Sequence, residues 1–231
     1  MVIKKIFEDK FLLVLNKPSG LVVNNSSSTK KIITLQDWLV EHEIGMEVAR
    51  NGIVHRIDKE TSGVLIIAKT QKAMDFLQRQ FKERMVGKMY MTMVHGRMIL
   101  RKGQVTAPIS RNPFNRTKFG VFVGGKESET RYEVVGFYKR GAQEFTYLKV
   151  FPKTGRTHQV RVHMKYLGHG VVSDEFYAGR KTARKDRLWC PRLFLQAVSL
   201  RIKHPKSKKY LLFEIGLADD LEKILDTMKK G

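Results

Sequence analysis

The chain has 231 residues, enough for one large domain with a substantial core or for two small ones. Its 44 Lys and Arg against 22 Asp and Glu give a formal net charge of +22, so we expect a polyanion partner, nucleic acid first and a membrane surface second. No run of about 18 apolar residues is present, which excludes a membrane-spanning helix, and a single cysteine, Cys190, excludes internal disulfides and a cysteine-based zinc site.

The first part of the chain has the pattern of a short sheet. Residues 11–15 form a continuous apolar run, which predicts a buried strand, and residues 16–20 have the composition of a turn. The apolar residues 21–23 predict a return to the sheet. Residues 24–31 are polar and rich in serine, which predicts a loop.

Two amphipathic helices are predicted next. Thr34 is a candidate N-cap with Asp37 three residues later, an aspartate version of the capping box, and this helix is expected to end near Gly45. Thr70 is expected to cap a longer helix that ends before Gly87. Its apolar positions recur at helical spacing and its basic positions lie elsewhere: Met74, Leu77, Phe81 and Met85 against Lys72, Arg79, Lys82 and Arg84.

Between these helices the chain carries the string His55-Arg56-Ile57-Asp58-Lys59-Glu60-Thr61-Ser62-Gly63, followed by the apolar run 64–68. Thr61, Ser62 and Gly63 predict a tight turn that leads directly into a buried strand. Asp58 would then be held on a rigid scaffold with an accessible carboxylate. Its basic neighbours would favour the ionised form and attract a polyanion. A solvated loop aspartate is the plainer alternative.

The middle of the chain is predicted to be mostly strands. Residues 88–96 alternate apolar and small polar side chains, which predicts a strand that carries Tyr90. Residues 97–125 are basic and rich in turn formers, which indicates short strands and exposed loops. The segments 129–135 and 144–151 alternate well enough to form paired antiparallel strands.

The segment 154–163 predicts a turn at Gly155 and a helix that Thr157 caps. Arg161 would lie near the start of this helix, where a positive charge opposes the helix dipole, so a carboxylate partner is expected. His158 and His163 would lie about 500° apart around the helix, which is a poor arrangement for one metal ion. The apolar face and the glycine that ends the helix are Val160, Met164, Leu167 and Gly168.

The end of the chain is expected to add a last strand and a last helix. Residues 211–215 form a short apolar segment that predicts the strand. Residues 217–230 have an amphipathic pattern that predicts the helix, with Leu221, Ile224, Leu225 and Met228 facing the core.

Two strings resemble signatures of the RluA-type pseudouridine synthases. Residues 55–63 are similar to H-R-L-D-x-x-T-S-G, with Ile57 in place of leucine, and residues 154–163 are similar to T-G-R-T-H-Q-I-R-V-H. Weaker resemblances are found at residues 16–20 and 88–96. Residues 168–179 also resemble a family segment but depart from it, because Gly170 replaces proline, Ser173 replaces glycine and Ala178 is inserted.

The resemblance covers roughly residues 11 to 215 and implies an α+β, pseudouridine-synthase-like fold. That fold has a large, mostly antiparallel mixed sheet, flanking helices and a central active-site cleft. We expect residues 1–231 to form a single catalytic domain, without the S4-type RNA-binding domain that many relatives carry in front. The implied activity is the isomerisation of specific uridines to pseudouridine in tRNA, ribosomal RNA or both.

The resemblance also implies roles for individual side chains. Asp58 would act as nucleophile or base, Arg161 would pair with it, and Tyr90 would stack on the target base. Arg56 would enter the space that the flipped nucleotide leaves. Further contacts to RNA are expected from His55, Arg156 and His158.

The implied chemistry changes no oxidation state, so neither a cofactor nor a metal is expected. RNA is the expected partner. We expect a monomer without an obligate protein partner, and a cytoplasmic location because the first nine residues lack an apolar segment of signal-peptide length. The alternative is a catalytically silent RNA-binding relative that acts as an RNA chaperone. An unrelated basic ribosome-associated or membrane-surface protein would not explain two ordered motifs about 100 residues apart.

Overall fold

The computed structural model describes residues 3–25, 29 and 32–231. The chain divides into two compact units, residues 1–88 with 197–215 and residues 89–196 with 216–231. Among the described residues, no helix is long and apolar enough to cross a bilayer.

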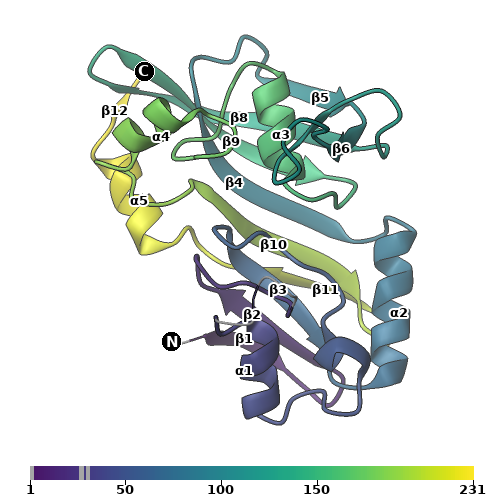
Figure 1. Ribbon diagram of the computed structural model, residues 1–231. Helices are drawn as coiled ribbons and strands as arrows, with labels where there is room; N and C mark the ends of the chain where they lie inside the picture. The colour runs from purple at the N-terminus through teal and green to yellow at the C-terminus, as the bar shows by residue number, and fades with distance from the viewer. Residues whose placement is uncertain (1–2, 26–28, 30–31) are drawn as a thin grey trace. The chain divides into compact units, whose positions relative to one another are not determined.

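The first unit is a sheet with helices packed on it (Figure 1). Strands β1, β2 and β3 follow one another in antiparallel order, β10 lies next to β3, and β11 pairs antiparallel with β10. The residues of β2 and β3 are almost all buried, as expected for continuous apolar runs. The elements are β1 (Lys4–Glu8), β2 (Leu12–Lys17), α1 (Leu35–Glu41), the 3-10 helix η2 (Ala49–Gly52), β3 (Ser62–Ala68), α2 (Gln71–Lys82), β10 (Leu195–Lys203) and β11 (Tyr210–Glu214).

Both predicted helix caps of this unit are present. The Thr34 side chain accepts a hydrogen bond from the Asp37 amide, and the Asp37 carboxylate accepts one from the Thr34 amide, so the capping box is complete. The Thr70 hydroxyl accepts from the Ala73 amide at the start of α2. Helix α2 contacts the sheet through one face and contributes to a core with β2, β3 and β10: Ala73, Met74 and Leu77 with Leu12, Val14, Val64, Ile66, Leu200 and Ile202.

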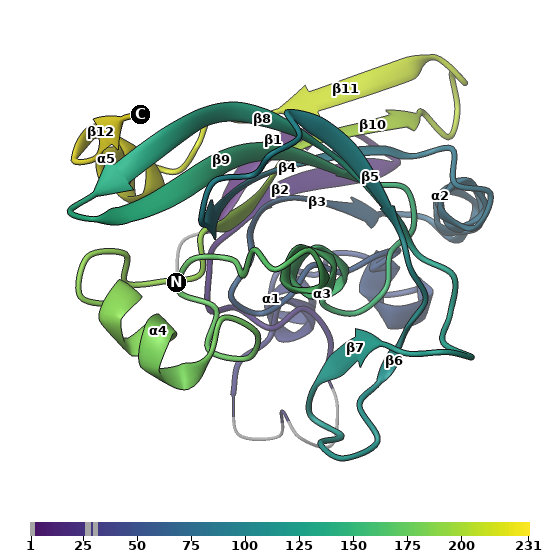
Figure 2. The same cartoon turned by 90° about the horizontal axis from the view of Figure 1, so that it is seen from above.

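The second unit is built on the long β8–β9 hairpin, with β4 paired antiparallel to β9 and both β5 and β12 paired to β8. Figure 2 shows α3 against one face of these strands, with the β6–β7 hairpin beside it. Val160 and Met164 of α3 pack with Leu148 and Val150 of β9. The elements are β4 (Gly87–His95), β5 (Lys102–Thr106), β6 (Ile109–Arg111), β7 (Phe119–Val121), β8 (Glu129–Arg140), β9 (Gln143–Pro152), α3 (Gln159–Tyr166), α4 (Arg180–Asp186), α5 (Asp219–Asp226) and β12 (Lys229–Lys230).

The expectation of an α+β fold with a large, mostly antiparallel sheet and flanking helices is confirmed. Several predicted boundaries were wrong. Residues 21–23 form a single β-bridge, from Val22 to Thr34, and not a strand. The first helix ends at Glu41 and not near Gly45, and the last one ends at Asp226, after which two residues pair with β8 as β12. Residues 26–28 and 30–31 of the predicted serine-rich loop lie outside the described residues.

Gly63 lies where β3 passes very close to β10. Its φ angle is +119°, and a Cβ atom at this position would lie 2.0 Å from the carbonyl oxygen of Ala197. Gly20 offers a comparison, because its φ angle is +88° but a Cβ atom there would meet nothing within 4 Å. Both positions require left-handed backbone, but only position 63 also excludes a side chain by close contact.

We therefore expect Gly63→Ala to destabilise the protein far more than Gly20→Ala. The Gly20 change adds only the strain of a left-handed alanine, about 1–2 kcal/mol, whereas the Gly63 change also forces two strands apart. The free energy of unfolding from urea titrations of both variants checks this. Equal losses for the two variants would contradict the close approach.

Candidate active site

The predicted site residues fall into both units. Three of them, His55, Arg56 and Asp58, belong to the first unit. The other four belong to the second unit: Tyr90, Arg156, His158 and Arg161. Among the described residues, no three His, Cys, Asp or Glu side chains form a group that could hold a metal ion.

Asp58 is half-buried and lies at the end of an extended segment, directly before a turn at Lys59 and Glu60 that leads into β3. Its carbonyl oxygen accepts a hydrogen bond from the Thr61 amide, which closes this turn. The preceding Ile57 is buried and anchors the segment, while the side chain of Arg56 is exposed. The carboxylate is therefore carried by a short loop with a buried residue on one side and a strand on the other, as predicted.

The residue that organises this loop is Lys17, whose side chain is completely buried at the end of β2. Its ammonium group donates to three backbone carbonyl oxygens, those of Pro18 (2.8 Å), Leu21 (2.8 Å) and Lys59 (3.1 Å). A buried cation is tolerated only when hydrogen bonds replace its hydration. One of these bonds ends on the residue that follows Asp58, so the charge of Lys17 holds the Asp58 loop in place.

The turn at residues 16–20 binds the same loop through two more hydrogen bonds. The Ser19 hydroxyl donates to the carbonyl oxygen of Glu60 at 2.7 Å, and the Gly20 amide donates to that of Lys59 at 2.8 Å. The sequence predicted a turn here from its composition and from a weak family resemblance, and Lys17 was given no role. The available signal was a lysine at the end of a continuous apolar run, where a charged side chain needs buried partners.

His55 forms part of the packing of the first unit. Its Nε2 atom accepts a hydrogen bond from the Ile66 amide at 3.1 Å, and its ring stacks on Phe81 with 4.6 Å between centroids. Burial, and to a smaller extent the positive charge of Lys88, lowers the pKa of His55 to about 3. Burial also lowers the pKa of Lys88 to about 8. The ring is therefore neutral at pH 7 and adds no positive charge beside Asp58, and the expected contact of His55 with RNA stays a prediction.

In the second unit, Arg161 lies buried near the start of α3. Its Nε and Nη2 atoms donate to the two carboxylate oxygens of Asp174 at 2.8 Å and 2.9 Å. The Asp174 carboxylate also accepts hydrogen bonds from the backbone amides of Phe176 and Tyr177, so its own loop and Arg161 both hold it in place. The expected need for a carboxylate partner is confirmed, and Asp174 meets it. The pairing of Arg161 with Asp58 joins residues of different units and stays a prediction.

Aromatic rings surround the Arg161 guanidinium, whose central carbon lies 5.1 Å from the Tyr177 ring centroid and 5.4 Å from that of Phe176. The Tyr177 hydroxyl lies 2.7 Å from Nδ1 of His158, so His158 and Arg161 share this neighbour. Tyr90 lies on β4 and packs against the cluster that contains Val160 of α3. The second unit thus brings Arg161 and His158 together, as the motif at residues 154–163 implied.

The start of α3 differs from the prediction. Thr157 does not cap the helix; His158 is the N-cap residue, in a left-handed conformation with φ of +57° and without a side-chain cap bond. The loop before the helix is organised by the buried Gln159. Its Oε1 accepts from the Arg156 amide and the Thr154 hydroxyl, and its Nε2 donates to the Glu129 carbonyl oxygen. These bonds hold the loop before the helix, but none of them goes to an amide of the first turn of α3.

The loop that carries Asp174 contains the departures from the family pattern. Ser173, which stands where the family has glycine, keeps the left-handed conformation with φ of +61°. Its hydroxyl donates to the Cys190 carbonyl oxygen at 2.5 Å, and its amide donates to the Asp186 carboxylate at 2.9 Å. Cys190 is buried, and burial raises the pKa of its thiol to about 11. Asp174 was not predicted, because no local signal in residues 168–179 indicates which cation its carboxylate contacts.

The chain is similar to known proteins both in sequence and in fold. Residues 11–166, which include Asp58, Tyr90 and Arg161, match the family model of RNA pseudouridylate synthase. The chain belongs to this family. The expected type is confirmed as well, since curated relatives are ribosomal large subunit pseudouridine synthases of the RluA kind.

Two curated relatives and one solved structure describe the similarity. Ribosomal large subunit pseudouridine synthase D of Nitrosomonas europaea is 37% identical, and the match covers 98% of this chain but 65% of that protein. Ribosomal large subunit pseudouridine synthase C of Vibrio parahaemolyticus is 34% identical, and the match covers 98% of this chain and 69% of that protein. The structure of human RNA pseudouridylate synthase domain containing 1 matches with a TM-score of 0.78 at 25% identity and covers 100% of this chain and 89% of that one.

The buried ion pair leads to a stability prediction. Asp174→Asn removes the negative charge that the buried Arg161 guanidinium contacts through two hydrogen bonds, and breaking a buried ion pair costs about 3–5 kcal/mol. The matched control is Glu175→Gln, since Glu175 is exposed and its nearest cation, Arg187, lies 3.7 Å away. We expect the control to lose less than about 1 kcal/mol. Urea unfolding of both variants gives the comparison, and similar losses would show that the Arg161–Asp174 pair is not a charge-dependent contact.

The neutral state of His55 predicts a pH dependence. Below about pH 6.5 the unfolded chain binds a proton at His55, whereas the folded chain binds it only near pH 3, so acid favours unfolding. This contribution is complete above pH 6.5 and falls by at most about 1.4 kcal/mol per pH unit below it. The free energy of unfolding of wild type minus that of His55→Asn should therefore decrease between pH 7 and pH 4.5. A constant difference would mean that the buried ring titrates normally.

Proposed function

We propose that this chain is an RNA pseudouridine synthase that isomerises specific uridines of ribosomal RNA, with tRNA as the second candidate substrate. The observation that carries the proposal is the family match over residues 11–166. The relatives at 37% and 34% identity are named as large-subunit ribosomal synthases, which favours ribosomal RNA. The chain spans 65% of the first relative and 69% of the second, so the transfer of their substrate to this chain is part of the proposal.

The reaction breaks the bond between N1 of uracil and C1′ of the ribose, turns the base, and joins it again through C5. At the end C5 loses a proton and N1 gains one, so the composition is unchanged and no electron is gained or lost overall. In the proposed mechanism the Asp58 carboxylate acts at the ribose, as a nucleophile at C1′ or as a base for the proton at C2′. Both routes require an ionised and immobile carboxylate. The hydrogen bonds from Lys17, Ser19 and Gly20 to residues 59 and 60 support the proposal that the carboxylate is immobile.

Arg161 is proposed to keep Asp58 ionised. Asp174 fixes the direction of the Arg161 guanidinium through two of its N–H donors, and we take Asp58 as a second carboxylate partner of the same group. A rigid guanidinium would orient a carboxylate as well as stabilise its charge. In this proposal Asp174 acts through Arg161 and does not touch the substrate.

The other predicted residues are assigned to the RNA. The target uridine has to leave its stack, which costs a few kcal/mol, and stacking on Tyr90 would recover about 1–3 kcal/mol of this. Arg56, which is exposed, would enter the space left by the flipped nucleotide. We further propose that Arg156 and His158 contact the backbone, and that residues 1–231 act as one catalytic domain, as a cytoplasmic monomer without a cofactor.

The direct test uses a ribosomal RNA transcript labelled with tritium at C5 of its uridines. Wild type should release tritium into water, and Asp58→Asn should release none because the amide can be neither nucleophile nor base. Glu41→Gln is the control, since Glu41 is an exposed carboxylate of the same unit on α1 and lies outside the proposed site.

Both variants should bind the transcript as wild type does in a filter-binding assay. Release by Asp58→Asn at the wild-type rate would end the assignment of Asp58. A wild-type protein that binds the transcript and releases no tritium would be the RNA chaperone of the alternative.

A further inference from the structure

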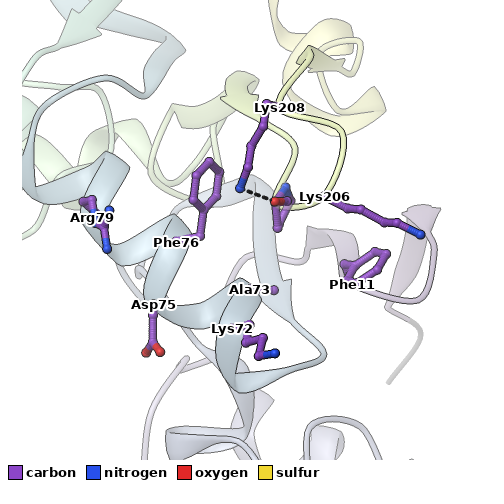
Figure 3. A pocket seen from close by; sticks show the side chains of 9 residues that line it. Phe11, Lys72, Ala73, Asp75, Phe76, Arg79, Lys206 and Lys208 are labelled. Atoms are coloured by element: carbon purple, nitrogen blue, oxygen red, sulfur yellow. Dashed lines mark hydrogen bonds between the residues drawn. The ribbon is translucent and has the colours of Figure 1, made fainter.

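A pocket of about 520 Å³ lies in the first unit between α2, the loop that joins β10 to β11, and Phe11. Figure 3 shows its side chains. It contains none of the residues assigned above to catalysis or to the target uridine. We call it the α2 pocket and define it by Phe11, Lys72, Phe76, Arg79, Lys206 and Lys208.

Four cations line the α2 pocket and one carboxylate, Asp75, accompanies them. Lys72 and Arg79 lie on the exposed face of α2, and Lys206 and Lys208 are exposed on the β10–β11 loop. None of the four forms an ion pair with any residue that the structure describes. Like charges around one hollow repel each other, so their arrangement is unfavourable for the protein alone and favourable for an anion that enters.

The α2 pocket also offers two aromatic rings, each beside a lysine. The ammonium group of Lys208 lies 3.7 Å from the centroid of Phe76 and donates to the carbonyl oxygen of Pro205 at 2.5 Å (Figure 3). The ammonium group of Lys206 lies 5.8 Å from the centroid of Phe11. Both rings are half-buried, so part of each ring is accessible beside its lysine.

The order of these residues along α2 is regular. Lys72, Phe76 and Arg79 are spaced by four and three positions, which places them on one face of the helix with the ring between the two cations. The opposite face, with Ala73, Met74 and Leu77, is in the core. Single-stranded nucleic acid is bound by surfaces in which cations follow the phosphates and aromatic rings stack with bases.

We propose that the α2 pocket binds a single-stranded segment of RNA, with phosphates on the four cations and a base on Phe76. This inference rests on the proposed function, because it takes RNA as the partner. It adds a contact that does not depend on the target uridine. A membrane surface is disfavoured because both rings are half-buried and not fully exposed. An acidic peptide is disfavoured because it would leave the rings without a planar partner.

The first test measures binding of a fluorescent oligoadenylate about 12 nucleotides long, which has no uridine to react. Lys206→Gln combined with Lys208→Gln should weaken binding several-fold and reduce the slope of log K against log salt by about 1.4, since each lost phosphate contact on a single strand removes about 0.7. The matched control combines Lys4→Gln with Lys82→Gln. These two lysines are exposed, lie outside the pocket and form no ion pair with described residues, and the control should keep the wild-type slope.

The second test examines the stacked base. Phe76→Leu should weaken oligoadenylate binding at least about five-fold, the lower end of the stacking range, and leave the salt slope unchanged. An abasic oligomer of the same length has the same phosphates without bases, so it should bind Phe76→Leu and wild type equally. Thermal unfolding of the variant establishes that it is folded.

Three results would overturn the inference. The first is an equal loss of oligoadenylate affinity in the two double-lysine variants, and the second is an unchanged oligoadenylate affinity in Phe76→Leu. The third is pocket-dependent binding of oligoglutamate or of anionic vesicles that is stronger than that of oligoadenylate. The tritium-release assay separates this inference from the proposed function. Release by wild type together with pocket variants that bind like the control would reject only the pocket. Pocket-dependent binding without tritium release would reject only the enzymatic activity.

Discussion

The buried ammonium group of Lys17 is the contact on which the first unit most depends. It joins three carbonyl groups from two loops that are about 40 residues apart in sequence. Charge-assisted hydrogen bonds of this kind are directional and stronger than neutral ones. The loop with Asp58 is therefore as rigid as the strand end that carries Lys17, although it has no regular secondary structure of its own.

The second unit uses a different device for a similar purpose. A bidentate ion pair between Arg161 and Asp174 fixes the guanidinium, and two backbone amides fix the carboxylate in turn. Aromatic rings cover the pair and keep water away from it. In both units a charged side chain is immobilised by the backbone of a neighbouring loop, which is what a site requires if its groups must hold their geometry while a large RNA binds and leaves.

Local features of the fold were predictable because their signals are local. The capping box at Thr34 and Asp37, the buried run of β2 and the alternating pattern of the β8–β9 hairpin each depend on residues near one another in sequence. The motifs at residues 55–63 and 154–163 identified the family for the same reason. The partners of Lys17 and Arg161 were not predictable, since burial and approach in three dimensions select them. His158 and not Thr157 is the N-cap residue of α3, and the buried Gln159 side chain forms the hydrogen bonds that hold the loop before this helix. The spacing of residues in the sequence does not indicate these bonds.

Cys190 has a practical consequence for labelling chemistry. The thiolate is the species that reacts with maleimides and iodoacetamide, and a buried thiol with a pKa of about 11 is almost entirely protonated at neutral pH. A cysteine introduced at an exposed position would thus react in its place. Dyes or spin labels can be attached at chosen sites of the natural sequence without first removing its own sulfhydryl group.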